Sequence, residues 1–345
     1  MRSLRPVAAR VVLLCGSLLV AFGVLELSFR VVYPPPVRFL YPQEFYDLDP
    51  ELGFALRPGQ TAFTHDRPVQ TNSWGLRDHE FAPEPAPGTL RVLALGDSQT
   101  FGAGLALSET WPKQLERRLQ AGPRRWEVVN AGVPGTDTWQ HEIILRRLLE
   151  VAHPHAVVLA LYVNDVVPRP DPRGADAPAQ TNTRSKRFVY LVKRSAVVTW
   201  IYHRLLVRWY ARQLGQGSST EEAVLTGRND ARAERGWQEV EQSLTAMNER
   251  CAARGVPLIV AILPRRDQVS GSNPGRAYNE RARRVASAHG IEAIDLLPDL
   301  IQEYRVKRDA LFIPWDGHNS AATNHVIAGR LAETLADLAP RLRAR

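Results

Sequence analysis

The strongest constraint on the fold is an alternation of short apolar runs with segments of helical spacing, which extends from residue 90 to residue 338. The apolar runs have the length of buried strands and span 90–95, 126–129, 156–163, 256–263 and 291–294. The segments with helical spacing span 111–119, 139–151, 237–254, 277–289 and 321–338. Gly255 and Gly290 follow two of these segments and are expected to end the helices.

This alternation predicts an α/β domain with a parallel sheet. Strands that are apolar throughout are typical of a sheet that helices cover on both faces. Right-handed crossovers then give a three-layer, doubly wound arrangement. In such sheets, functional sites form outside the carboxyl ends of the strands, so we expect the site residues to follow these ends.

The chain divides into three expected parts, with an insertion in the last. We expect a membrane segment over 1–33, an extension of short strands and loops over 34–88, and the main domain over 89–345. The insertion, at about 166–235, contains a basic helical stretch at 188–214. Its aromatic residues suit packing on the main domain, although a lid over the site or a membrane-facing surface remains the alternative. These aromatic residues are Trp200, Tyr202, Trp209 and Tyr210.

The N-terminus carries a targeting signal. Arg2, Arg5 and Arg10 precede an apolar run at 11–25, which Glu26 and Arg30 interrupt before three prolines. No convincing cleavage site follows the run, so the pattern favours an uncleaved signal-anchor over a cleaved signal peptide. Because the basic end stays in the cytoplasm, the rest of the chain is expected outside the bacterial inner membrane. Secretion after cleavage is the alternative.

The composition argues against several other classes of function. The net charge is +8, but the arginines are scattered and no zinc-finger spacing or RNA-binding aromatic signature accompanies them, so nucleic-acid binding is not expected. The two cysteines, Cys15 and Cys251, are not expected to pair. No metal site or cofactor is expected, because five histidines lack ligand spacing and suit surface or capping positions. They are His141, His153, His155, His289 and His325.

Polar turns follow the first three predicted strands. The first strand runs into Gly96-Asp97-Ser98, a tight turn that could expose a nucleophilic serine and leave backbone N–H groups free for an oxyanion. Gly135 follows the second strand and Asn164 the third. Each segment taken alone is typical of an ordinary turn.

A fourth segment precedes the last predicted helix. It contains His318, with Asp316 two residues before it. Such a pair supplies a general base and the carboxylate that orients it.

Together, the order and spacing of these four segments resemble the SGNH, or GDSL-type, hydrolase superfamily over about residues 89–340. The resemblance implies a five-stranded sheet with flavodoxin-like strand order. It also implies that Ser98 is the nucleophile, that His318 is its base and that Asp316 orients His318. The amides of Ser98 and Gly135 and the side chain of Asn164 would form the oxyanion hole. The segment at 72–78 and the membrane segment resemble a membrane-anchored bacterial subgroup.

Departures from the family pattern bear on the substrate. The aspartate stands two residues before His318 rather than three, a spacing that resembles members linked to O-acetylation of envelope polysaccharides. Tyr162 stands where many members have glycine. Asp165 is expected to be a structural hydrogen-bond partner rather than a catalytic acid.

The resemblance therefore implies a serine esterase or deacetylase that cleaves O-acyl esters, chiefly O-acetyl esters of envelope glycans, through an acyl-Ser98 intermediate. An O-acetyltransferase of envelope polysaccharide is the first alternative. A non-catalytic glycan-binding or assembly protein on the same fold is the second.

Overall fold

A central parallel sheet organises the computed structural model, which describes residues 4–32, 45–64, 67–166, 168, 195–201, 219–228, 230–313 and 317–342. Its five strands lie in the order β6-β5-β7-β8-β9. They are β5 (Thr89–Gly96), β6 (Arg125–Gly132), β7 (Ala156–Leu161), β8 (Leu258–Ile262) and β9 (Glu292–Asp295). All four pairings are parallel. The predicted three-layer α/β fold with flavodoxin-like strand order is thereby confirmed.

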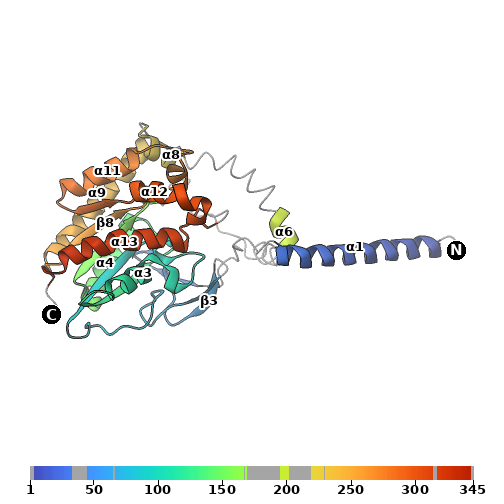
Figure 1. The fold of residues 1–345 in the computed structure, drawn as a ribbon, viewed down its shortest axis with the longest axis horizontal. Coiled ribbons are helices and arrows are strands. Elements are labelled where there is room, and N and C mark those ends of the chain that lie inside the picture. The colour runs from blue at the N-terminus through green and yellow to red at the C-terminus, as the bar shows by residue number, and fades with distance from the viewer. Residues whose placement is uncertain are drawn as a thin grey trace.

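Helices cover both faces of this sheet (Figure 1). One hydrophobic core lies under α4 (Thr138–Ala152), α9 (Ala231–Ala252) and α11 (Ala277–Ala288). The other lies under α3 (Trp111–Leu119), α12 (Leu297–Lys307) and α13 (Ala321–Leu338). Along β5, Leu93 and Leu95 face the first core, whereas Leu90, Val92 and Ala94 face the second. This alternation explains why the strand is apolar throughout.

The predicted strands and helices of the main domain are present, with most boundaries within a few residues. Helices α3 and α13 have the bounds that the sequence predicted. Gly255 and Gly290 both adopt positive φ angles directly after their helices, as expected of C-terminal caps. Helix α9 begins six residues before the predicted start, because the Asp230 side chain accepts a hydrogen bond from the Ala233 N–H and caps the helix there.

Several short elements were not predicted. They include α12, whose second residue is Pro298, and the smaller helices α2 (Ser98–Phe101), α8 (Ser219–Thr226) and α10 (Arg266–Ser270). Three 3-10 turns complete this set: η1 (Leu107–Glu109), η2 (Val163–Val166) and η4 (Arg308–Leu311).

The described part of the N-terminal extension consists of two small antiparallel hairpins and a long loop. Strands β1 (Tyr46–Asp49) and β2 (Gly53–Leu56) form the first hairpin, and β3 (Thr61–Thr64) and β4 (Arg67–Gln70) the second. Phe45, Leu56 and Val69 contribute to the same core as α4 and α9. The extension is therefore packed onto the main domain, although the domain boundaries drawn from the sequence remain a prediction.

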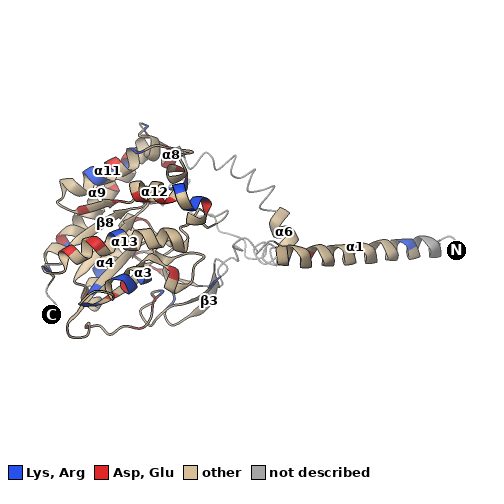
Figure 2. Ribbon diagram, in the orientation of Figure 1, with Lys and Arg blue, Asp and Glu red and all other residues tan. Residues whose placement is uncertain are grey.

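Helix α1 (Leu4–Val32) projects away from this body as a single rod (Figure 1). Within it, Ala9–Val32 has a mean hydropathy of 2.3, and in the described part of the chain it is the one helix long and apolar enough to cross a membrane. Its ribbon is uncharged over most of its length, with a basic segment near its start (Figure 2), and the ion pair of Glu26 and Arg30 lies near its other end. A membrane anchor and a signal sequence both have this character.

Only part of the insertion falls within the described residues. Helix α6 (Ala196–Ile201) lies beside the end of α1 that is nearer the body (Figure 1). Trp200 belongs to α6, whereas Tyr202, Trp209 and Tyr210 lie outside the described residues.

Candidate active site

Ser98 lies at the carboxyl edge of the sheet, as the first residue of the short helix α2. The Asp97 side chain caps this helix by accepting a hydrogen bond from the Gln99 N–H, at 2.8 Å. The neighbouring residues of α2 are buried, whereas Ser98 is half-buried and therefore reachable. Capping and packing thus fix the backbone that presents the serine.

Two glycines allow α2 to approach the strands closely. A Cβ atom at Gly132 would lie 2.2 Å from the Phe101 backbone nitrogen, and one at Gly96 would lie 2.2 Å from the Thr100 Oγ1. Gly96 also has a φ of 149°, which side chains disfavour. The turn that carries Ser98 therefore depends on glycine on two adjacent strands.

His318 reaches Ser98 from a loop 220 residues away in sequence. Its Nε2 lies 2.8 Å from the Ser98 Oγ, the distance that a nucleophile and its general base require. The loop is fastened on both sides of the histidine. The Asn319 N–H donates to the Gln99 Oε1 at 3.0 Å, and the Ile313 N–H donates to the His318 carbonyl at 2.8 Å. Asp316, the expected partner of His318, lies outside the described residues.

Asn164 lies at the same edge, on the turn η2 after β7. Its Nδ2 donates to the Asp97 Oδ2 at 3.0 Å, which leaves the second hydrogen of the amide for another acceptor. The Asp165 carboxylate closes this turn by accepting from the Tyr162 N–H at 2.7 Å. This hydrogen bond is consistent with the structural role that the sequence predicted for Asp165.

Gly135 ends the turn after β6 and is exposed, with a φ of 82°. Within the described part of the chain, neither its backbone N–H nor that of Ser98 donates to a protein acceptor. Free amides of this kind suit an oxyanion hole. The role of each site residue remains a proposal.

Buried carboxyl groups surround the site. Burial raises the pKa of Asp97, which its bonds with Gln99 and Asn164 oppose. Burial, together with the charge of Asp97, raises the pKa of Asp137 to about 7. Burial also raises the pKa of Asp165 well above its usual range. Of the three, Asp97 interacts electrostatically with His318, so an ionised Asp97 favours the imidazolium that His318 becomes when it accepts a proton.

Two histidines that were expected at surface or capping positions are instead buried. His141 is 0% exposed, and burial lowers its pKa to about 3. Its Nε2 lies 3.0 Å from the Thr136 Oγ1. His155 accepts a hydrogen bond at Nδ1 from the Arg91 N–H. Both predictions were wrong because these side chains find hydrogen-bond partners inside the protein.

Sequence reasoning missed two residues that hold the site together. One is Gln99, which fastens the His318 loop to α2. The other is Arg77, whose buried guanidinium donates to the carbonyls of Phe101, Gly102 and Leu105 at the end of α2. Both contacts join segments that are distant in sequence, so no local sequence pattern predicts them.

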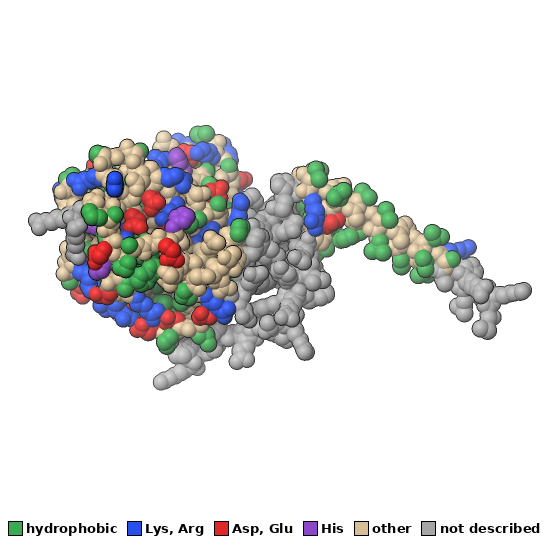
Figure 3. Space-filling model, turned by 90° about the horizontal axis from the view of Figure 1, so that it is seen from below, with side chains coloured by type: hydrophobic (Ala, Val, Ile, Leu, Met, Phe, Trp, Pro, Cys, Tyr) green, Lys and Arg blue, Asp and Glu red, His purple; other side chains and the backbone are tan. Residues whose placement is uncertain are grey.

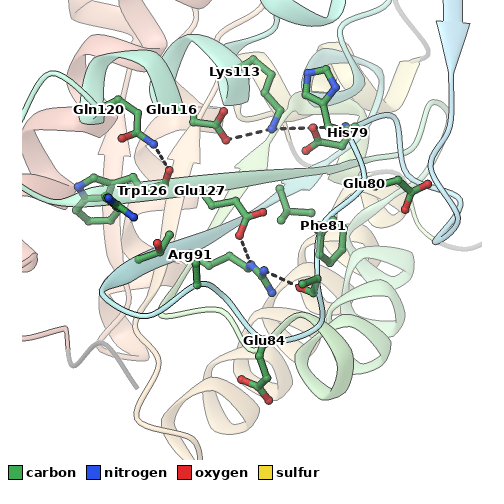
Figure 4. Close-up of a pocket in the computed structure, with 16 residues that line it drawn as sticks. His79, Glu80, Phe81, Glu84, Arg91, Lys113, Glu116, Gln120, Trp126 and Glu127 are labelled. Carbon is green, nitrogen blue, oxygen red and sulfur yellow. Dashed lines mark hydrogen bonds and ion pairs between the residues drawn. The ribbon is translucent and has the colours of Figure 1, made fainter.

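A polar hollow of about 610 Å³ lies away from these residues, between the extension and the sheet edge (Figure 4). Lys113 contacts Asp78 and Glu116 there, and Arg91 contacts Glu127 and the backbone of the extension. None of the proposed catalytic residues lines it. The paired charges indicate a seam that joins the extension to the main domain.

Comparison with known families identifies the domain. Residues 94–206 match the model of the GDSL-like Lipase/Acylhydrolase family, and this range includes Ser98, Gly135 and Asn164. The chain carries a GDSL-like lipase/acylhydrolase domain. The predicted family and enzyme class, a carboxylic ester hydrolase, are confirmed at this level.

Several solved structures are similar to between 71% and 74% of the chain. TesA is 18% identical and matches 72% of this chain and 99% of its own, with a TM-score of 0.44. A lipase/acylhydrolase from Enterococcus faecalis is 15% identical, with coverage of 74% and 98% and a TM-score of 0.44. A catalytic mutant of Axe2, an acetylxylan esterase from Geobacillus stearothermophilus, is 14% identical, with coverage of 71% and 93% and a TM-score of 0.43. Likenesses this weak support no inference about substrate. No curated protein matches the sequence.

Proposed function

We propose that the protein is a serine esterase that removes O-acyl groups, chiefly O-acetyl groups, through an acyl-Ser98 intermediate. The observation that carries the proposal is the distance of 2.8 Å between the Ser98 Oγ and the His318 Nε2 at the carboxyl edge of the sheet. Ser98, Asn164 and Gly135 lie on the loops after three neighbouring strands, β5, β7 and β6, which supports their assignment to one oxyanion hole.

The reaction follows from these positions. The Ser98 Oγ attacks the ester carbonyl carbon while its proton moves to the His318 Nε2. The carbonyl oxygen gains the negative charge and takes hydrogen bonds from the Ser98 and Gly135 amides and the free hydrogen of the Asn164 Nδ2. When the tetrahedral intermediate collapses, the alcohol leaves with the proton from His318. Water then attacks the acyl-serine by the same steps, which releases the acid and restores Ser98.

The position of Asp316, two residues before His318, supports its assignment as the carboxylate that orients the imidazole. Asp97 supports the site in a different way, because it holds both the α2 backbone and the Asn164 side chain. We therefore assign Asp97 as a positioning residue.

We further propose that α1 anchors the protein in the bacterial inner membrane and that the GDSL-like domain lies outside the cytoplasm. The basic residues at the start of α1 and the apolar span that follows support this orientation. Acetylated envelope glycans are the esters that such a domain would meet.

Purified protein tests the activity. We expect hydrolysis of p-nitrophenyl acetate and release of acetate from at least one acetylated sugar. Ser98→Ala should lower kcat/KM by about 10⁴-fold or more, whereas Ser108→Ala, at an exposed serine of η1, should leave it unchanged. Equal rates for wild type and Ser98→Ala would refute the proposal. Acetylation of an added glycan would instead assign the transferase alternative.

A further inference from the structure

The insertion contacts the anchor helix at one well-defined place. Of the side chains described between residues 9 and 32 of α1, only Glu26 and Phe29 are not exposed, and both face α6. They stand three residues apart and therefore on one face of the helix. The Phe29 ring meets the Trp200 ring edge-on, with centroids 5.3 Å apart.

Glu26 is the centre of this contact. Its carboxylate accepts hydrogen bonds from the Ser195 Oγ at 2.7 Å, the Ala196 N–H at 2.8 Å and the Val197 N–H at 3.2 Å. Arg30, one turn further on, donates at 2.8 Å. Four donors therefore satisfy one carboxylate, and the start of α6 supplies three of them.

If α1 spans a bilayer, the depth of Glu26 explains why its carboxylate has four hydrogen-bond donors. A hydrocarbon core about 30 Å thick takes about 20 residues of helix. With Arg10 at one interface, Arg30 falls near the other and Glu26 falls about one turn inside it. A carboxylate at that depth is costly unless donors surround it. The other side chains along α1 are exposed and mostly apolar, with charges only near its two ends (Figure 3). The hydroxyls of Ser17 and Ser28 donate to carbonyls of the preceding turn.

The composition of α6 suits the same environment. Its sequence, Ala-Val-Val-Thr-Trp-Ile, contains no charge, and Ile201 remains 43% exposed at its end. A helix of six residues is about 9 Å long, so it fits within the interfacial layer beside α1. Tryptophan is enriched at that depth.

We propose that α6 is a second membrane contact, an interfacial helix that Glu26 holds against the anchor, and that its partner is the outer surface of the lipid bilayer. This inference rests on the proposed anchor and does not depend on ester hydrolysis.

The insertion that contains α6 begins directly after η2, the turn that presents Asn164. Asn164 and Ala196, the first residue of α6, are 32 residues apart in sequence.

Cross-linking in inner-membrane vesicles tests the contact in the full chain. With Cys15→Ser as background, the pair Phe29→Cys and Trp200→Cys should cross-link on oxidation, because the Glu26 bonds remain. Cys251 is 0% exposed and its pKa is raised to about 12 by burial, so it should not interfere. The pair Val31→Cys and Trp200→Cys is the matched control, since Val31 is 77% exposed on another side of α1. Equal cross-linking of the two pairs, or none in either, would overturn the proposal.

A fluorescent reporter tests the bilayer itself. In the full chain reconstituted in phosphatidylethanolamine and phosphatidylglycerol vesicles, an environment-sensitive dye on Ile201→Cys should be quenched by lipids that carry a shallow nitroxide. The same dye on Val306→Cys, which is 80% exposed on α12, should not be quenched. Glu26→Ala should reduce the quenching at residue 201 several-fold. A water-like signal at residue 201, or quenching indifferent to Glu26→Ala, would contradict the proposal, as would a mature protein that lacks α1. Hydrolysis of p-nitrophenyl acetate, measured in parallel, reports on the esterase separately.

Discussion

At the scale of single residues, Asp97 contacts two parts of the proposed site without being one of its reacting groups. Asp97 is buried behind Ser98 and connects two of the loops that would surround the reacting ester. One of its oxygens accepts from the α2 backbone and the other from Asn164. A carboxamide of the same size has only one oxygen and cannot accept both hydrogen bonds. Replacing Asp97 with asparagine therefore tests its role directly.

We expect Asp97→Asn to lower kcat by about 10- to 100-fold with little change in KM, because the new NH₂ group must face one of the two donors and displace Asn164 or the α2 start. Steady-state kinetics with p-nitrophenyl acetate measures the effect. Asp47→Asn, on the exposed strand β1, is the control. A wild-type kcat in a folded Asp97→Asn protein would remove Asp97 from the positioning role.

Asp137, at the start of α4, makes the stability of the protein depend on pH. Its pKa is raised from 3.8 to about 7, so the folded state retains a proton that the unfolded chain has already released. The stability that this group contributes is therefore complete below about pH 4 and is lost as the pH rises to about 7. Asp137→Asn keeps a helix cap but removes the titration.

The variant should match the wild type at pH 4 and be more stable at pH 8, by on the order of 2–4 kcal/mol. Urea unfolding at the two pH values measures the difference. Asp230→Asn, at the cap of α9, controls for the substitution at a helix start. A gap between Asp137→Asn and wild type that is the same at both pH values would show that Asp137 does not titrate in this range.

At the scale of elements, the short helix α2 is held from two sides. On one side, Gly132 of β6 lets the backbone of α2 at Phe101 approach the backbone of the strand. At its end, Arg77 from the extension donates to three carbonyls, and its guanidinium lies 4.7 Å from the Phe101 ring centre. Four residues cannot form a stable helix alone, so these contacts fix the element that carries Ser98.

Gly132→Ala should strongly destabilise the protein, by about 3–5 kcal/mol, because the added methyl would meet the Phe101 backbone nitrogen, which cannot move aside. Thermal or urea unfolding measures the loss. Gly329→Ala in α13 has only ordinary contacts and should be neutral or slightly stabilising. Similar stabilities for the two variants would mean that α2 does not need this close approach.

Arg77→Lys should cost about 2–4 kcal/mol and lower kcat, since a single ammonium cannot reproduce the planar fork that reaches the carbonyls of α2. Arg57→Lys, at a half-exposed ion pair with Asp47, should cost less than about 1 kcal/mol. Urea unfolding and steady-state kinetics measure the stability and the kcat of both variants. An Arg77→Lys protein that behaves like Arg57→Lys would show that the extension does not support α2.

At the scale of the whole molecule, the sequence was sufficient to predict the parallel sheet and the loops of Ser98 and Asn164 at its carboxyl edge. The apolar runs predicted five strands, and the rule that sites form at carboxyl ends selected the loops of Ser98 and Asn164. His318 could be paired with Ser98 only through the family resemblance, because 220 residues separate them.

What the sequence could not predict depends on tertiary contacts. The Gln99 side chain meets Asn319 and the Arg77 side chain meets α2 only once the chain has folded, and His141 is buried because neighbouring elements cover it. Helix α12 was missed because it buries only Leu297 and Leu300, which is too few for clear periodicity. The docking of α6 on Glu26 likewise joins segments 170 residues apart.

Covalent labelling is the direct test of the proposed activation of Ser98 by His318. A fluorophosphonate should attach to Ser98 of the folded wild-type protein, as peptide mass spectrometry would establish. Labelling should vanish in Ser98→Ala and slow by about 100-fold or more in His318→Ala. A folded wild-type protein that takes up no label, or a His318→Ala variant that labels as fast as the wild type, would show that His318 does not activate Ser98.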